Sequence, residues 1–294
     1  MHVPVLLHET VSALACAPGK KVIDATLDGG GHTRAIVEQY PDVRVLGIEL
    51  DPVLMAQFRR GHPDLASRIT LVNDSYVNLA EIVQKNDFTP DAVLFDLGLS
   101  SWHYESSGRG FSFQKDEPLD MRYDPERGQL TAAQIVNTYS REQIGHLLSE
   151  YGEEQFADAI AERMVAVRGE EPILTTAQLV SVVEEAVPAW YRRKKIHCAT
   201  KTFQALRIAV NDELGNVRIG VQAAIDVLNP GGRLAVISFH GIEDKIVREL
   251  FKKNTAAGII RWTTRRTIKP SWDEIKRNPR SRSAKMKVVE KLPQ

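Results

Sequence analysis

The stretch Lys21-Val-Ile-Asp-Ala-Thr-Leu-Asp-Gly-Gly-Gly-His32 passes from an apolar run through three glycines into a segment with helical character. The apolar residues predict a short strand over 21–25, and the pattern after the glycines predicts a helix over about 32–39. Glycine lets the backbone come close to a ligand, and the first turn of a helix carries N–H groups without partners in the helix. This strand, turn and helix therefore predict the binding site of a polar cofactor in an α/β protein.

Strand and helix continue to alternate further along the chain. Apolar runs over 43–48, 69–72 and 91–96 predict three more strands, and a helix is expected between Pro52 and Arg60. Strands that alternate with helices at this spacing are typical of a parallel, doubly wound sheet. The expected fold class is therefore α/β.

Acidic residues stand at or just after the ends of these strands, namely Asp24, Glu49, Asp74 and Asp96. Open α/β sheets bind ligands at the carboxyl ends of their strands, and Glu49 stands where a carboxylate can accept hydrogen bonds from both hydroxyls of a ribose. For Asp74 a helix N-cap is the simpler interpretation. The glycine run lacks the last glycine of the dinucleotide fingerprint, because Arg34 occupies that position. S-adenosylmethionine has no pyrophosphate to place there, so we favour it over a nicotinamide dinucleotide.

The alternation stops after Asp96. Residues 99–125 are rich in Gly, Ser and charge, and residues 131–188 have helical periodicity that begins with Thr131 as a helix N-cap. This part of the chain predicts an inserted helical domain.

The strand pattern returns near the C-terminus. One long helix is predicted over about 201–229, and strands are predicted over 234–239, 259–264 and 285–290. The expected organisation is a Rossmann-like domain formed by 1–105 and 206–294, with an inserted all-α domain over 106–205.

The overall composition is that of a globular protein, with 294 residues, 43% hydrophobic and 26% charged. No apolar run approaches the roughly 18 residues of a membrane helix, and the first residues lack the pattern of a signal peptide. Cys16 and Cys198 cannot form a disulfide framework, and no His or Cys cluster has ligand spacing, so no metal is expected. These features exclude the membrane, secreted, fibrous and disordered classes of protein. The expected location is the cytoplasm.

Equal numbers of basic and acidic residues conceal a separation of charge. Residues 245–294 carry 15 Lys and Arg against 4 Asp and Glu, although the whole chain is neutral. Clustered cations favour a polyanionic partner, because binding releases the counterions of its phosphates. A basic surface that packs against an acidic one is the alternative interpretation.

Two further stretches combine aromatic and cationic side chains. One polar loop carries Phe111 and Phe113 close to Arg109, and the two rings either stack an unpaired base or anchor the loop to the core. The stretch Trp190-Tyr-Arg-Arg-Lys-Lys195 places two aromatic residues beside four cations, which predicts either an RNA contact or a solvated helix end.

Motifs that carry a family resemblance are distributed over the whole chain. They are His2-Val-Pro-Val-Leu-Leu-His-Glu9, Gly29-Gly-Gly-His32, Asp96-Leu-Gly-Leu-Ser-Ser101, Arg109-Gly-Phe-Ser-Phe-Gln-Lys-Asp116, Pro118-Leu-Asp-Met-Arg122, Tyr151-Gly-Glu-Glu154, Thr202-Phe-Gln-Ala-Leu-Arg207 with Asn211, Ser238-Phe-His240 with Glu243-Asp244, and Asn278-Pro-Arg-Ser-Arg282. Together these motifs resemble those of the bacterial 16S rRNA cytosine-N4 methyltransferases of the RsmH/MraW type.

The resemblance implies a Rossmann-like S-adenosylmethionine-dependent methyltransferase domain with an inserted all-α domain for substrate recognition. It implies N4-methylation of a cytidine in the decoding region of small-subunit (16S) rRNA, with the small ribosomal subunit as partner, and it leaves a homodimer open. The cofactor-binding residues that it implies are Gly30, Gly31, His32, Glu49, Tyr76, Asp96 and His103.

Methyl transfer to a cytosine amine depends mainly on the alignment of donor and acceptor, because the lone pair of the amine is delocalised into the ring. A hydrogen-bond acceptor at the amine would orient that lone pair and offset the charge that develops on nitrogen. Asp96 is the first candidate for this catalytic position, and His240 is a second candidate for a direct role. The residues expected to bind substrate are Arg109 and Arg122 at phosphates, with Phe111 or Phe113 at the base.

The sequence departs from the family pattern at several positions. Glu49 stands for a usual Asp, Trp102-His103 for Pro-Gln, Cys198 for Pro and Gly241 for Ser. These changes keep two alternatives open: a non-catalytic RNA-binding factor of ribosome assembly, and a methyltransferase with a different nucleic-acid target.

Overall fold

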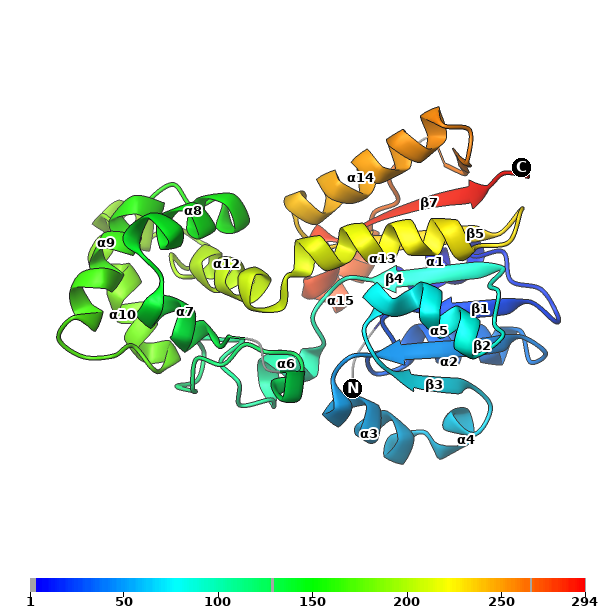
Figure 1. The fold of residues 1–294 in the computed structure, drawn as a ribbon, viewed down its shortest axis with the longest axis horizontal. Helices are drawn as coiled ribbons and strands as arrows, with labels where there is room; N and C mark the ends of the chain where they lie inside the picture. The colour runs from blue at the N-terminus through cyan, green and yellow to red at the C-terminus, as the bar shows by residue number, and fades with distance from the viewer. Residues whose placement is uncertain (1–3, 128–129, 265, 294) are drawn as a thin grey trace. The chain divides into compact units, whose positions relative to one another are not determined.

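The computed structural model describes residues 4–127, 130–264 and 266–293 (Figure 1). His2 and Val3, which begin the first family motif, lie outside these residues. The chain divides into two compact units. The sheet unit comprises Met1–Gly98 and Leu214–Gln294, and the helical unit comprises Leu99–Glu213.

The sheet unit is built on seven strands in the order β3-β2-β1-β4-β5-β7-β6 (Figure 1). Their bounds are β1 Lys21–Asp24, β2 Arg44–Glu49, β3 Thr70–Asn73, β4 Ala92–Asp96, β5 Arg233–Ser238, β6 Ile260–Trp262 and β7 Lys285–Lys291. The first five strands run parallel, which confirms the predicted doubly wound, Rossmann-like sheet. β7 runs antiparallel to both β5 and β6, and it lies between them although it follows both in the chain.

The strand order places a switch point beside β1. β1 pairs with β2 on one side and with β4 on the other. The strands that follow β1 are therefore added first on one side of it and later on the other. The carboxyl ends of β1 and β4 therefore flank the position where sheets of this type bind ligands. The strands carry apolar side chains on both faces of the sheet, because helices cover both faces. Ile23, Leu94 and Phe95, for example, have no exposed surface.

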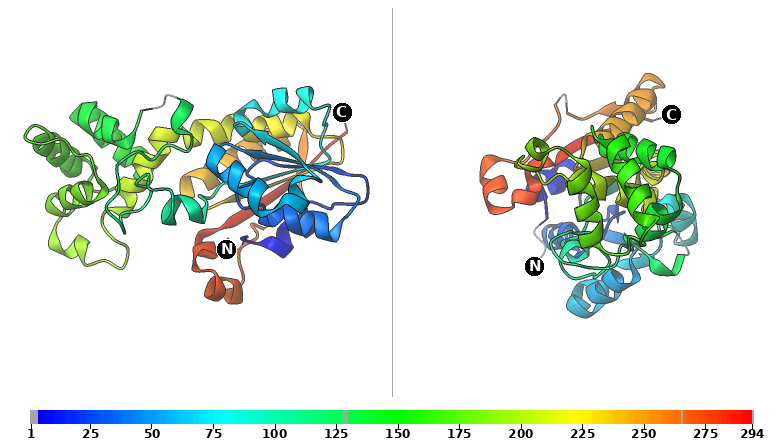
Figure 2. Two further views of the ribbon diagram at one scale, coloured as in Figure 1. Left: turned by 90° about the horizontal axis from the view of Figure 1, so that it is seen from below. Right: turned by 90° about the vertical axis from the view of Figure 1, so that its left-hand side faces the viewer.

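Helices of the sheet unit pack on both faces of the sheet (Figure 2). α1 and α2 lie on one face, where Val11 and Ile36 join the buried sheet residues Val22, Leu94 and Ala235 in one apolar core. α5 and α13 lie on the other face (Figure 2). The bounds are α1 Leu7–Ala13, α2 Gly31–Gln39, α3 Pro52–Gly61, α4 Pro63–Ala66, η1 Tyr76–Asn78, α5 Leu79–Lys85, α13 Glu213–Val227, α14 Gly241–Ala256, α15 Trp272–Arg277 and η3 Pro279–Ser283.

The described regular elements of the helical unit are α6 Ser101–Glu105, η2 Pro125–Arg127, α7 Ala132–Thr138, α8 Arg141–Gly152, α9 Ala157–Arg168, α10 Thr176–Ala186, α11 Ala189–Arg192 and α12 Thr200–Asn211. Reciprocal capping boxes begin three of them, at Thr131 with Gln134, at Ser140 with Gln143 and at Thr175 with Gln178. The predicted N-cap at Thr131 is thus confirmed.

The helical unit extends beyond the predicted range 106–205 at both ends. At its N-terminal end, His103 of α6 packs against the rings of Phe111 and Tyr123. At its C-terminal end, Leu206 and Val210 of α12 belong to the buried core of the same unit. Side-chain packing, which sequence periodicity does not report, places these segments with the inserted helices.

The prediction of one long helix over 201–229 is wrong, because α12 and α13 are separate helices. Asp212 between them has a left-handed backbone conformation with φ of 45°, which ends the helical hydrogen-bond pattern. Asn211 ends α12, and its side chain accepts a hydrogen bond from the Tyr123 N–H at 2.9 Å and donates one to the Met121 carbonyl at 2.7 Å. Asp and Asn tolerate the left-handed region better than most residues, so an apolar pattern can run across a break of this kind.

Within the described residues, no helix has both the length and the apolar character needed to cross a membrane.

Candidate active site

The turn after β1 is tied to the first turn of α2 through Asp24. The Thr33 hydroxyl donates to one carboxylate oxygen of Asp24 at 2.6 Å, and the Thr26 N–H donates to the other at 3.3 Å. Asp24 is 1% exposed, and this burial raises the pKa of its carboxyl group. Asp24 thus shapes the turn from inside, a role that its position after a strand did not distinguish from ligand binding.

Two glycines of the turn are required by their surroundings. Gly30 is the N-cap of α2 with φ of +71°, and a Cβ on it would lie 2.2 Å from the Phe58 ring. A Cβ on Gly31 would lie 2.2 Å from Cγ of Pro4. The N-cap Gly30 provides no capping side chain to the first turn of α2, whose N–H groups have no partners within the helix.

Glu49 ends β2 and is held by backbone N–H groups on both of its carboxylate oxygens. The Asp51 N–H donates to Oε1 at 2.8 Å, and the Asp28 N–H donates to Oε2 at 2.9 Å. Burial first, and the nearby Asp28 carboxylate second, raise the pKa of Glu49 to about 8. Because each carboxylate oxygen can accept more than one hydrogen bond, this fixed carboxyl group keeps acceptor capacity for two hydroxyls.

Asp96 ends β4 and faces the first turn of α2. Nδ1 of His32 lies 3.6 Å from Oδ2 of Asp96, and Nε2 of His32 donates to the Val5 carbonyl at 3.0 Å. The Asp96 N–H donates to the Thr26 hydroxyl at 2.7 Å. Burial lowers the pKa of His32, which favours its neutral form. The contacts bring the carboxyl ends of β1 and β4 together around these side chains.

Tyr76 begins η1, directly after β3. Its ring meets the Phe95 ring edge-on at a centroid distance of 5.3 Å, and Phe95 immediately precedes Asp96. A Cβ on Gly220 of α13 would lie 2.4 Å from the Tyr76 ring, so that glycine makes room for it. The sheet unit therefore gathers six of the seven predicted cofactor residues at the carboxyl ends of its strands: Gly30, Gly31, His32, Glu49, Tyr76 and Asp96.

His240 has a structural task at the start of α14. The Glu243 N–H donates to Nδ1 of His240 at 3.4 Å, while Nε2 of His240 lies 2.9 Å from Oε1 of Glu243. The other oxygen of Glu243 accepts the Phe239 N–H at 2.9 Å. His240 and Glu243 form a capping box, with histidine where Ser or Thr is usual. Nδ1 of His240 and the His240 N–H are the atoms engaged in this cap.

His103, the seventh predicted cofactor residue, belongs to the helical unit. It is 5% exposed and packs edge-on against Phe111 at 5.0 Å and Tyr123 at 5.2 Å. Phe111 and Tyr123 stack on each other at 5.7 Å with an interplanar angle of 10°. Phe111 is 5% exposed, so this predicted base-stacking residue is part of a buried aromatic cluster.

The two predicted phosphate-binding arginines hold the loop of residues 99–125 in shape. Arg109 donates to the carbonyls of Arg122 and Tyr123 at 3.2 and 2.8 Å, and its guanidinium lies over the Trp102 ring. Arg122 forms a bidentate pair with Asp120, with both contacts at 2.7 Å. Their charges are therefore partly compensated within the loop.

Phe113, the other predicted stacking residue, lies in a different group of rings from Phe111. Its ring is 4.8 Å from His197 and 5.1 Å from Phe203. It is half-buried and connects the loop to α12. Both phenylalanines therefore anchor the loop to the core, which is the alternative to base stacking that the sequence left open.

Sequence reasoning missed a largely buried ion pair in the helical unit. Arg207 donates to both carboxylate oxygens of Glu213, at 2.8 and 2.9 Å, and the Tyr123 hydroxyl donates to the same carboxylate at 2.8 Å. The two residues lie on either side of the Asp212 break, so helical periodicity gave no signal of their contact.

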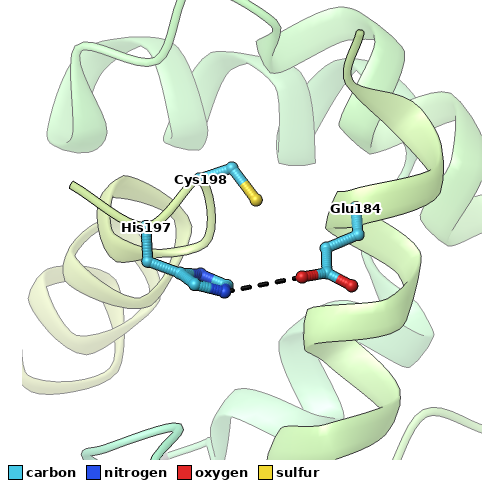
Figure 3. A group of neighbouring side chains, drawn as sticks. All are labelled: Glu184, His197 and Cys198. Atoms are coloured by element: carbon cyan, nitrogen blue, oxygen red, sulfur yellow. Dashed lines mark ion pairs between the residues drawn. The ribbon is translucent and has the colours of Figure 1, made fainter. Parts of the chain in front are cut away.

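Glu184, His197 and Cys198 lie close enough to bind a metal ion together (Figure 3). Their protonation opposes this, because the Ala199 N–H donates to Nδ1 of His197 at 3.2 Å and so leaves the proton of the neutral ring on Nε2. Nε2 faces Glu184 at 3.5 Å. Burial and the Glu184 charge raise the pKa of the Cys198 thiol, which disfavours the thiolate. The group is therefore a polar contact between His197 and Glu184 beside a buried thiol.

Comparison with known proteins agrees with the family resemblance found in the motifs. Residues 1–292 match the model of the MraW methylase family. Proteins named "Ribosomal RNA small subunit methyltransferase H" from Thermomicrobium roseum and Desulfotalea psychrophila are each 44% identical to this chain. Each match covers 99% of this chain, with 94% and 98% of the respective relative. The chain therefore belongs to the MraW methylase family.

Proposed function

We propose that this protein transfers the methyl group of S-adenosylmethionine to N4 of a cytidine in the decoding region of 16S rRNA. The observation that carries the proposal is the gathering of Gly30, Glu49 and Asp96 at the carboxyl ends of β1, β2 and β4. Membership in the MraW methylase family and relatives named as rRNA small subunit methyltransferases support it. We place the reaction in the cytoplasm, on the small ribosomal subunit.

The residues of the turn and strand ends suit a cofactor with a ribose and an amino-acid end. Glu49 is fixed by two backbone N–H groups and accepts the ribose hydroxyls. The N–H groups of the first turn of α2, at Gly31 and His32, suit a carboxylate. Tyr76 offers an aromatic edge beside β4. The sulfonium of the bound cofactor supplies an electrophilic methyl group.

Asp96 is the residue to which we assign the alignment of the target amine. Its carboxylate accepts a hydrogen bond from the exocyclic N–H of cytosine, which turns the nitrogen lone pair toward the methyl group. The same carboxylate offsets the positive charge that develops on nitrogen during displacement. The Thr26 hydroxyl accepts the Asp96 N–H and so fixes the backbone at the end of β4, while Nδ1 of His32 lies 3.6 Å from Oδ2 of the Asp96 side chain. We assign no chemical step to His240, since its Nδ1 accepts the Glu243 N–H at the start of α14.

The helical unit is the part that we assign to RNA recognition. Within it, Arg109, Phe111 and Arg122 keep residues 99–125 in a defined shape by internal contacts. A loop that is already ordered loses less conformational entropy when RNA binds. These residues therefore influence RNA binding indirectly, by holding the loop of residues 99–125 in position.

The test is methyl transfer from labelled S-adenosylmethionine to small ribosomal subunits that lack the modification, followed by mass spectrometry of the nucleosides. N4-methylcytidine in 16S rRNA is the expected product. Methyl incorporation at another atom or in another RNA would contradict the assigned target. Cofactor binding without any incorporation would instead support the non-catalytic assembly factor.

A further inference from the structure

Residues 189–196, here called the basic segment, form an exposed connection between α10 and α12 in the helical unit. Trp190 is 56% exposed and Ile196 is 67% exposed, which is unusual for side chains of their size and polarity. The four residues Arg192, Arg193, Lys194 and Lys195 between them are exposed as well. The segment thus presents large apolar groups and four positive charges to solvent within eight residues.

The N-terminal end of the basic segment is anchored by Tyr191. Its hydroxyl donates to the buried Glu154 carboxylate, with contacts of 3.0 and 2.9 Å to the two oxygens. The Phe156 ring packs edge-on against Tyr191 at 4.9 Å. Because Tyr191 points into the core of the unit, its neighbour Trp190 is held at the surface.

The C-terminal end is anchored by the residues of Figure 3. His197 pairs with Glu184 of α10 and packs on the ring of Phe113, and Cys198 is 2% exposed. With both ends fixed, the exposed side chains stand on a defined surface. A solvated helix end, the alternative that the sequence left open, needs no such anchoring.

The charges of the basic segment are not neutralised by carboxylates of the described residues. Within the part of the chain that the structure describes, none of its four cations forms an ion pair with a carboxylate, in contrast to Arg122 with its bidentate Asp120 partner. Lys194 lies over the rings of Trp190 and Tyr191, at 5.0 and 4.6 Å from their centroids. An ammonium group is thereby held directly beside the exposed indole.

We propose that the basic segment is an RNA-contact surface that binds an unpaired stretch of ribosomal RNA, with a base stacked on Trp190 and phosphates at Arg192, Arg193 and Lys195. The inference rests on the proposed function, which makes RNA the substrate. Stacking on an exposed aromatic ring combined with flanking cations is how proteins hold single-stranded nucleic acid without reading its sequence. An acidic protein partner would match the charges but would leave the role of the indole unexplained.

The experiment measures binding of the full-length protein to small ribosomal subunits that lack the modification, across a range of salt concentrations. Trp190→Ala tests the stack, Trp190→Phe tests whether another aromatic ring restores it, and a triple variant with Arg192→Gln, Arg193→Gln and Lys195→Gln tests the charges. Leu174→Ala, an exposed apolar residue of the same unit, is the control for the indole. A triple variant with Arg59→Gln, Arg60→Gln and Lys85→Gln removes the same charge from the sheet unit, outside the basic stretch 245–294, and is the control for the cations.

We expect Trp190→Ala to weaken binding about 5- to 100-fold and Trp190→Phe to restore most of the affinity. The triple charge variant is expected to reduce the slope of log K against log salt by about 2, since each phosphate contact on a single strand contributes about 0.7. The affinity for S-adenosylmethionine, measured separately, should equal that of the wild type, which also shows that the variants are folded.

Variants of the basic segment that bind like their controls, while the wild type methylates the subunits, would overturn the inference and leave the proposed function intact. Loss of binding on removing charge, with no effect of Trp190→Ala, would overturn the base stack and point to an acidic protein partner. Wild-type protein that binds subunits through Trp190 but transfers no methyl group would support the surface and contradict the proposed function.

Discussion

The imidazole of His32 lies between two parts of the chain that the sheet brings together, with Nδ1 at 3.6 Å from Oδ2 of Asp96 and Nε2 at 3.0 Å from the Val5 carbonyl. A carbonyl only accepts, so Nε2 carries a proton and Nδ1 faces the carboxylate. This contact joins the first turn of α2 to the end of β4 across the switch point. Because burial also favours the neutral ring, Nδ1 carries a lone pair and offers Asp96 no hydrogen bond, so His32 lies beside the carboxylate without orienting it.

Replacement of Asp96 tests its assigned part in the reaction. Asp96→Asn keeps the size of the side chain but removes the charge that would offset the developing positive charge on the target nitrogen. We expect methyl transfer to fall about 100- to 1,000-fold, in the range found when one preorganised group is removed from a reacting centre. Asp87→Asn is the control, because Asp87 is exposed and Asn also suits its φ of 46°. Normal turnover of Asp96→Asn would remove Asp96 from the mechanism.

The raised pKa of Glu49 predicts a specific dependence of stability on pH. An acid with a folded-state pKa of about 8, against an ordinary value of 4.5, binds more protons in the folded than in the unfolded state between these values. Its contribution to the free energy of unfolding is therefore complete below pH 4.5 and is lost as the pH rises through 8. Urea unfolding from pH 5 to pH 9 should show a smaller decline for Glu49→Gln than for the wild type. An equal decline of the free energy of unfolding with pH in both proteins would contradict the raised pKa of Glu49.

Alanine substitutions at Gly30 and Gly19 allow the cost of backbone strain to be measured separately from the cost of a steric clash. Both have a left-handed φ, +71° and +76°, but a Cβ on Gly19 would meet nothing within 4 Å, whereas one on Gly30 would meet the Phe58 ring. Gly19→Ala should cost about 1 kcal/mol of the free energy of unfolding. Gly30→Ala should cost about 1–3 kcal/mol more, because the ring must move. Equal losses in chemical denaturation would show that Phe58 yields freely.

Substitutions of His240 test whether this residue caps a helix or takes part in the reaction. His240→Ala should lower the free energy of unfolding by about 1 kcal/mol through loss of the cap, whereas His240→Asn, which can also accept the Glu243 N–H, should keep most of it. Turnover per folded molecule should stay close to that of the wild type in both. A stable Asn variant with strongly reduced turnover would instead give His240 a direct part in the reaction.

Much of the sheet unit follows from local pattern. Apolar runs bounded by glycine, proline and acidic residues predict β1 to β5 within a residue or two, and the Thr131-x-x-Gln134 spacing predicts the start of α7. The family follows from motifs such as Arg109-Gly-Phe-Ser-Phe, whose residues are adjacent in sequence. Strand ends also predict that Glu49 and Asp96 lie at the same edge of the sheet, since parallel strands bring their carboxyl ends to one edge.

The sequence by itself thus determined the strands β1 to β5, the start of α7 and the identity of the residues at the strand ends, because these depend on residues close together in the chain. Only the tertiary structure decided what those residues contact. The hydrogen bonds of Asn211 to residues 121 and 123, the insertion of β7 between β5 and β6, and the pairing of Arg122 with Asp120 show this. A charged or polar side chain has the same local signature whether its partner is a ligand or the protein, and the partner is set by segments distant in the chain.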